Sequence, residues 1–136
     1  MKGVVVDTSA AIAILTGEAT RDDLLDHLAA ADERLISAGT LIELGIVLEA
    51  RIGPGAPGVI DRFMRDGGLD LVPVDRVHVD RAMEGWRRFG RGHHRAALNL
   101  GDLFAYAVAV ASGHPVLCIG EDFASTDVEV VRPGRR

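Results

Sequence analysis

Short apolar runs alternate along this chain with longer segments of helical periodicity. Runs at 3–6, 34–37, 69–74, 115–120 and 128–131 predict strands, and helical patterns or caps separate most of them. Strands joined through helices lie parallel in one sheet, and such a sheet is covered by helices on both faces. We therefore expect an α/β fold with a parallel central sheet. The chain length favours one domain over residues 1–136.

Polar residues with N-cap chemistry mark the starts of the expected helices. Thr8 and Ser9 follow the first strand, and Thr20 precedes a helix over 21–31. Thr40 opens a long helix that ends near Gly53. Further helices are expected at 58–68, from a cap at Asp75 to about Phe89, and over the weakly charged segment 96–112 that Gly113 ends.

Basic residues are unevenly placed in an acidic chain. The formal net charge of −5 argues against a non-specific nucleic-acid binder. The segment WRRFGRGHHR at 86–95 nevertheless contains four arginines, two histidines and no acid. Arginine suits bidentate contact with phosphate, although a charged run of this kind is also typical of a solvated loop. The candidate substrate-binding residues are Arg87, Arg88, Arg91 and Arg95.

Membrane and export signals are not expected. Asn99 and Asp102 interrupt the longest uncharged run too early for a membrane span. Asp7 falls inside what would be the apolar part of a signal peptide. These features predict a cytoplasmic protein without a membrane partner. The single cysteine, Cys118, excludes an internal disulfide and a cysteine-rich zinc site.

Four acids follow strands or stand in the first turns of helices. Asp7 follows the first strand, Glu43 lies in the helix after the second, Asp102 begins the segment LGDLFAYAVA, and Asp122 follows VLCIG. Ligands of an open parallel sheet bind beyond the carboxyl ends of its strands. We therefore expect these four carboxylates to meet at one edge of the sheet.

Three of the acids also have structural explanations. TLIE at 40–43 fits a capping box, the helix dipole favours Asp102, and Asp122 stands among turn formers. Asp7 is the hardest to explain in this way, because an acid after a buried strand needs a partner for its charge. One shared site accounts for all four acids more economically than four separate coincidences.

Clustered carboxylates repel one another, by about 4 kcal/mol per pair at 4 Å and an effective dielectric near 20, unless a cation lies between them. All-oxygen ligands select Mg²⁺ or Mn²⁺ over zinc and copper. Metal-activated water can then hydrolyse a phosphodiester bond. The basic segment would hold the polyanionic substrate, which strengthens its functional interpretation.

Four segments, VVVDTSAAIAIL, LIELGIVLEAR, GRGHHRAALNLGDLFAYAVA and PVLCIGEDFASTD, resemble the successive motifs of PIN-domain ribonucleases, specifically the VapC toxins of VapBC modules. The resemblance covers Val4 to about Asp127, nearly the whole chain. It implies an α/β/α three-layer PIN fold and Mg²⁺-dependent cleavage of RNA, with Mn²⁺ as a substitute. It also implies a small VapB antitoxin, a homodimer, and a heterotetramer or larger complex with the antitoxin.

The family's acidic residues map onto this sequence at Asp7, Glu43, Asp102 and Asp122. Asp7 and Asp102 would be metal ligands, Glu43 would orient or bridge, and Asp122 would act through water or a second ion. Ser9 fits the family's hydroxyl that orients the first acid. Glu121 and Asp127 are alternatives to Asp122 for the fourth position. Leu103 departs from the small residue or cysteine that many relatives carry, but it lies beside a ligand rather than on one.

Two functions from other classes stay open at this stage. A catalytically silent PIN-fold module would bind RNA or a protein without cutting, and it is disfavoured because all four acids are present. A phosphoacceptor receiver domain also gathers acids beyond a parallel sheet. It depends on a late lysine, whereas the only lysine here is Lys2. The acidic cluster also suggests that an antitoxin arginine could occupy the site and block the metal.

Overall fold

The computed structural model describes residues 2–134 of the chain. Its elements in chain order are β1 (Gly3–Val6), α1 (Thr8–Leu15), α2 (Arg21–Ala30), β2 (Glu33–Ser37), α3 (Ala38–Ile52), the 3-10 helix η1 (Gly53–Gly55), α4 (Ala56–Asp66), β3 (Asp70–Val72), α5 (Arg76–Phe89), α6 (Leu100–Ser112), β4 (Val116–Leu117) and β5 (Val130–Val131). The predicted alternation of strands and helices is confirmed. The strands β3, β4 and β5 are shorter than the apolar runs that predicted them.

All neighbouring strands in the sheet run parallel, in the order β3-β2-β1-β4-β5. The chain moves outward from β1 to β2 and β3, then returns to place β4 on the other side of β1. The order of the strands therefore reverses between β1 and β4. In open α/β sheets, ligands bind in the crevice at the carboxyl edge of such a switch point.

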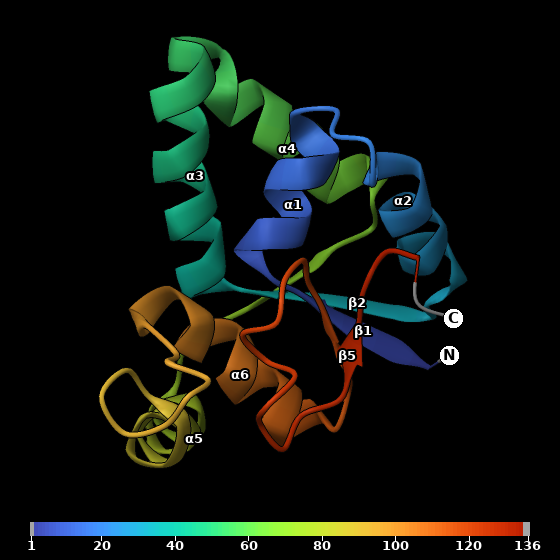
Figure 1. Ribbon diagram of the computed structural model, residues 1–136. Coiled ribbons are helices and arrows are strands. Elements are labelled where there is room, and N and C mark those ends of the chain that lie inside the picture. Colours follow the sequence, from blue (N-terminus) through green and yellow to red (C-terminus); the bar gives the residue numbers. More distant parts are fainter. Residues whose placement is uncertain (1, 135–136) are drawn as a thin grey trace.

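Side chains alternate along β1 between two separate apolar cores. Val4 and Val6 belong to the core formed with α1, α2, α3 and α4, whereas Val5 belongs to the core formed with α5 and α6. Figure 1 shows these two groups of helices on opposite sides of the sheet. The expected three-layer α/β/α arrangement is confirmed. Within residues 2–134, no helix is both long enough and apolar enough to cross a membrane.

The helix starts differ from several of the expected caps. Asp7, rather than Thr8 or Ser9, is the N-cap of α1. Ser37, rather than Thr40, caps α3, because β2 turns into the helix at once and leaves Thr40 buried inside it. Thr20 stands at the start of α2 but makes no capping hydrogen bond with its side chain.

Of the other expected helices, α4 runs over Ala56–Asp66 rather than 58–68 and α2 ends at Ala30 rather than 31, whereas the ends of α3 and α5 are as expected. Asp75 caps α5 through a hydrogen bond from the backbone N–H of His78. Gly113 ends α6 in the left-handed conformation, with φ of 76°, which suits a residue without Cβ. Asn99 is the N-cap of α6, so this helix begins at Leu100 rather than at 96, and the residues before it form a separate loop.

Candidate metal centre and active site

The four predicted acids come together near the carboxyl edge of β1 and β4. Asp7 directly follows β1, and Asp102 lies in the first turn of α6. Glu43 lies in the second turn of α3, one turn later than expected, because the helix begins at Ala38. Asp122 lies in the turn region after β4. The charges of the other three acids all act to raise the pKa of Asp102, so the four carboxylates share one electrostatic environment.

Asp7 is a buried carboxylate, with 5% of its surface exposed. Its Oδ2 accepts hydrogen bonds from the Ser9 hydroxyl at 2.6 Å and from the Ser9 backbone N–H at 3.1 Å. The Ser9 oxygen in turn accepts from the backbone N–H of Ile119 at 3.0 Å, which ties this acid to the segment after β4. Burial is the main cause that raises the pKa of Asp7, and the charge of Glu43 adds to the rise. Ser9 therefore orients Asp7, in the way the family resemblance implies.

Glu43 is held by contacts with two other elements. The Thr8 hydroxyl donates to its Oε1 at 2.5 Å. The carboxylate lies directly against Gly101, where a Cβ would collide with its oxygen atoms. The capping box suggested by TLIE is wrong, because the Thr40 hydroxyl is buried without a hydrogen-bond partner among the described residues. The structural explanation for Glu43 therefore fails, and its orientation toward α6 supports a role in the site.

Asp102 serves as a capping residue at the same time as it lies in the site. Its Oδ2 accepts from the Asn99 backbone N–H at 3.0 Å, and Asn99 Oδ1 accepts from the Asp102 backbone N–H at 3.0 Å. This reciprocal pair is a capping box at the start of α6. Burial is the main cause that raises the pKa of Asp102 to about 6, and the charges of Asp7, Asp122 and Glu43 contribute to the same rise.

The two alternatives to Asp122 are engaged elsewhere. Glu121 forms an ion pair with Arg132. Asp127 accepts a hydrogen bond from the buried hydroxyl of Tyr106 at 2.9 Å. It also pairs with Arg88 at 3.1 Å.

Asp122 itself is exposed and makes no hydrogen bond or ion pair with the residues that the structure describes. Among Glu121, Asp122 and Asp127, it is also the one whose charge is a cause of the raised pKa of Asp102. These contacts favour Asp122 as the fourth acid of the site.

The donor set fits a hard divalent cation that keeps part of its water shell. Among residues 2–134, no arginine, lysine or histidine forms an ion pair with any of the four acids. The buried carboxylate of Asp7 therefore lacks a positive partner among these residues. Over the same residues, no three His, Cys, Asp or Glu side chains are grouped closely enough to hold one ion together. Mg²⁺ is commonly held by one or two carboxylates plus water, so the remaining acids would act through water.

The basic segment comprises the last turn of α5, which carries Arg87 and Arg88, and the loop after it, which carries Arg91 and Arg95. Arg88 pairs with Asp127, whereas Arg87, Arg91 and Arg95 are exposed and make no ion pair within the described part of the chain. Of the four predicted substrate-binding arginines, three are therefore available to an incoming anion. Arg88 lies 4.6 Å from the centre of the Phe89 ring, which further fixes its position.

Sequence reasoning missed the residues that position the acids. Thr8 was interpreted as a cap, yet its hydroxyl holds Glu43. Gly101 was not assigned a role, although its missing side chain makes room for Glu43. The only signal in the sequence was the glycine directly before Asp102, and a contact between residues 43 and 101 cannot be inferred from spacing alone.

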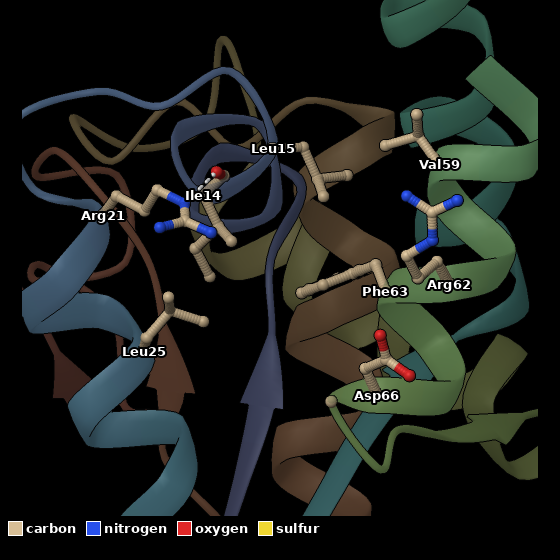
Figure 2. Close-up of a pocket in the computed structure, with 9 residues that line it drawn as sticks. Ile14, Leu15, Arg21, Leu25, Val59, Arg62, Phe63 and Asp66 are labelled. Atoms are coloured by element: carbon tan, nitrogen blue, oxygen red, sulfur yellow. Dashed lines mark hydrogen bonds between the residues drawn. The ribbon is translucent and has the colours of Figure 1, made fainter. Parts of the chain in front are cut away.

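A separate hollow of about 270 Å³ lies between α1 and α2 on one side and α4 on the other. Figure 2 shows its apolar walls, which include Leu15, Leu25 and Phe63, with Arg21 and Arg62 at its margins. None of the four acids lines this hollow. It is therefore a surface distinct from the acidic site.

Comparisons with known proteins point to one family. The family model of the PIN domain matches residues 4–129. A protein of Mycolicibacterium smegmatis named Ribonuclease VapC is 41% identical over 128 residues, which cover 94% of this chain and 99% of that protein. Ribonuclease VapC30 of Mycobacterium tuberculosis is 38% identical over 128 residues, covering 94% of this chain and 98% of its own.

Solved structures share the fold at lower sequence identity. The structure of Mycobacterium tuberculosis VapC20, described as a Sarcin-Ricin loop cleaving toxin, has a TM-score of 0.77 at 21% identity and covers 96% of this chain and 99% of its own. VapBC2 from Rickettsia felis, bound to a DNA fragment from its promoter, gives a TM-score of 0.77 at 12% identity, with coverage of 96% and 98%. These likenesses confirm the three-layer fold that the sequence predicted.

Proposed function

The chain belongs to the PIN-domain family and, within it, to the VapC ribonucleases, and from this premise we propose that Asp7, Glu43, Asp102 and Asp122 form its Mg²⁺-dependent active site for RNA hydrolysis. The observation that carries the proposal is the shared electrostatic environment of four acids from four different segments. The whole of residues 1–136 would act as one PIN domain. RNA in the cytoplasm would be its substrate.

Each acid has a role that its contacts support. Asp7 and Asp102 would hold the cation directly, because each has its orientation fixed by hydrogen bonds to one oxygen. Glu43 and Asp122 would act through water. When bound, the cation would supply Lewis-acid chemistry to the reacting phosphate group. Mg²⁺ suits a site made only of carboxylates and open to water, and Mn²⁺ would substitute for it.

The exposed arginines of the basic segment would bind the RNA backbone. Arg87, Arg91 and Arg95 make no ion pair with the described residues and can face phosphate groups. Arg88 would act indirectly, since it is paired with Asp127. These contacts predict that neutralising Arg91 or Arg95 weakens RNA binding and leaves the free energy of unfolding nearly unchanged.

The test is cleavage of total RNA by the purified protein with Mg²⁺, with EDTA, and as the Asp7→Asn and Asp102→Asn variants. We expect discrete cuts that require both metal and the two acids. Asp122→Asn should lose at least 10-fold in rate, whereas the matched controls Glu121→Gln and Asp127→Asn should cut like the wild type. Cutting by Asp102→Asn at the wild-type rate would refute the proposal.

The same RNA experiment and the fold distinguish this function from two others. A silent binding module would form intact RNA–protein complexes at saturating Mg²⁺ without any cleavage. A receiver-like phosphoacceptor needs a lysine near the acids, but Lys2 precedes β1 and so lies at the opposite edge of the sheet. The fold therefore argues against the phosphoacceptor hypothesis.

We further propose a VapB-type antitoxin as the partner, in a complex that also contains two copies of this chain. Two VapBC complexes and a toxin-antitoxin complex from Klebsiella pneumoniae are among the proteins of similar fold. The hollow in Figure 2, with its apolar walls and two arginines, would accept the apolar face of an antitoxin helix. Ile42 and Ile46, which are 65% and 67% exposed on one face of α3, would contact the second copy.

Purified antitoxin should abolish cleavage, and light scattering should report a heterotetramer or a larger complex. An antitoxin arginine that enters the acidic site would also weaken Mg²⁺ binding. If the antitoxin bound without changing either cleavage or metal affinity, inhibition through the acidic site would be excluded.

A further inference from the structure

A second hollow, of about 390 Å³, lies beside the acidic site. Its walls come from the last turns of α5, the basic loop and the start of α6: Met83, Trp86, Arg91, Asn99, Leu100 and Leu103. Most of the lining is apolar, and Arg91 is the one charged side chain in it. Leu100 is 70% exposed and Met83 is 42% exposed, so neither side chain is explained by the core.

Backbone contacts within the loop place Arg91 next to α6. The N–H of Leu98 donates to the carbonyl of Phe89 at 3.0 Å, and the N–H of Arg91 donates to the carbonyl of Leu98 at 3.0 Å. Ala97 adopts a φ of 52°, a left-handed conformation that is unfavourable for a residue with Cβ. The loop is therefore a constrained turn that returns the chain to Leu100, not a slack connection.

The Trp86 ring is held as one wall of this hollow. The His93 ring meets it edge-on, with ring centres 5.2 Å apart. Gly90 leaves the space that the indole fills, since a Cβ at that position would collide with the ring. An aromatic ring fixed in this way loses little conformational freedom when a flat group stacks on it.

Asn99 connects the hollow to the acidic site. Its side chain lines the hollow, and the same side chain accepts a hydrogen bond from the backbone of Asp102. A group in the hollow would therefore be separated from Asp102, a proposed metal ligand, by the Asn99 side chain. Leu100 also lines a third hollow, together with Glu43 and with Ile42 and Ile46, the two side chains proposed above to contact the second copy.

We propose that this hollow is a nucleobase subsite, which holds one unstacked base of single-stranded RNA next to the bond that is cut. The inference rests on the proposed ribonuclease function and extends it to the form of the substrate. Sequence-specific RNA recognition targets unpaired bases that stack on aromatic rings and arginine planes. Trp86 and Leu100 would contact the base, and Arg91 would contact an adjacent phosphate group.

The sign of the local charge favours RNA over a protein partner. Arg91 lines the hollow, Arg87 and Arg95 lie within four residues of it in the chain, and none of the three has an acidic partner among the described residues. An unpaired guanidinium group in the wall of an apolar hollow, with two more exposed arginines close by in the chain, matches the alternation of phosphate and base in a nucleic acid. An antitoxin or a second copy of this chain would instead need acidic groups opposite them.

Trp86 is the only tryptophan in the chain, so its fluorescence reports on this hollow alone. The experiment titrates wild-type protein in EDTA with a single-stranded oligoribonucleotide and, separately, with an abasic ribose-phosphate chain of the same length. We expect the first to quench the fluorescence in a saturable way and the second to bind about 10-fold more weakly, with little quenching. Equal quenching by both chains would overturn the proposal.

Variants with matched controls assign the contact. Leu100→Asn should weaken the binding of the oligoribonucleotide about 5-fold or more. Ile52→Asn, a change at another exposed apolar side chain, should leave this affinity unchanged. Arg91→Gln should reduce the slope of log affinity against log salt concentration by about 1, as expected for the loss of one phosphate contact. Arg65→Gln on α4 should leave this slope unchanged.

Three further outcomes separate this proposal from its alternatives. If Leu100→Asn changed the oligomeric state but left RNA affinity intact, the hollow would be a contact between copies, and the proposal would be wrong. If the wild type cut RNA with Mg²⁺ but showed no base-dependent quenching, the subsite would fail and the nuclease would stand. Base-dependent quenching by a protein that never cuts would support the subsite and refute the nuclease.

Discussion

Replacing Asp102 with asparagine should stabilise the metal-free protein at pH 8. Burial and three neighbouring acids raise the pKa of Asp102 from 3.8 to about 6 in the folded state. Between these two pH values the folded state binds more protons than the unfolded state, so the free energy of unfolding falls as the pH rises. Above about pH 6 this loss is complete, whereas asparagine never ionises and escapes it. The Asn99 backbone N–H can still donate to the amide oxygen at residue 102, so the cap survives.

The magnitude follows from the size of the shift. A rise of about two pKa units corresponds to about 3 kcal/mol at full conversion. Because Asp102 is only partly buried, solvent screening reduces this to about 1–2 kcal/mol. For a domain of this size, each kcal/mol moves the melting temperature by about 4 °C.

Urea unfolding in EDTA, run at pH 4 and at pH 8 on both proteins, measures the effect. We expect Asp102→Asn to be more stable than the wild type at pH 8 and close to it at pH 4. Asp61→Asn, a change at an exposed acid of α4, is the matched control and should show no such pH-dependent difference. Equal stabilities of Asp102→Asn and the wild type at pH 8 would refute the reasoning that burial and the neighbouring acids destabilise the ionised Asp102.

Three other perturbations test the same geometry. Mg²⁺ at 100 times its Kd should stabilise the wild type by roughly 2.7 kcal/mol in thermal melts and Asp102→Asn by much less. Gly101→Ala should reduce RNA cleavage at least 10-fold, because its Cβ would collide with Glu43, while Gly45→Ala, in open space on α3, should leave cleavage unchanged and raise stability by about 0.5–1 kcal/mol. Tyr106→Phe, which removes a hydrogen bond to Asp127, should cost about 1 kcal/mol in urea unfolding without slowing cleavage.

The sheet could be predicted because its determinants are local. Each strand is a short apolar run, and the parallel direction follows from the helices between them. Even the meeting of Asp7 with Asp102 needed only the rule that strands end at one edge. The order of the strands, with β4 beside β1, was not predicted, because it depends on which pairings bury the two apolar faces best.

The prediction of the α3 cap was wrong because two possible capping residues, Ser37 and Thr40, lie close together in the sequence. TLIE matched a capping box, yet Ser37 caps α3 because β2 ends there and its hydroxyl reaches the Gly39 backbone N–H at 3.1 Å. Once the helix begins at Ala38, Thr40 falls on its buried face. A motif three residues long cannot show where the preceding strand stops pairing.

The contacts that orient the acids join residues far apart in the chain. Thr8 and Glu43 are 35 positions apart, and Tyr106 and Asp127 are 21 apart. Side-chain hydrogen bonds of this kind follow from packing rather than from periodicity. This is why Glu121 and Asp127 stood as alternatives to Asp122 in the sequence but are separated from it by their partners in the structure.

Asp7 and Asp102 show that capping and metal binding are not competing explanations. Each carboxylate accepts a backbone N–H at the start of a helix through Oδ2, and that bond fixes the plane of the group. A ligand whose plane is already fixed loses less conformational freedom when a cation binds. The same caps offset part of the cost of burying negative charge when no cation is present. The helix starts therefore orient the proposed ligands, and the cluster of acids at the switch point is a consequence of how α1 and α6 begin.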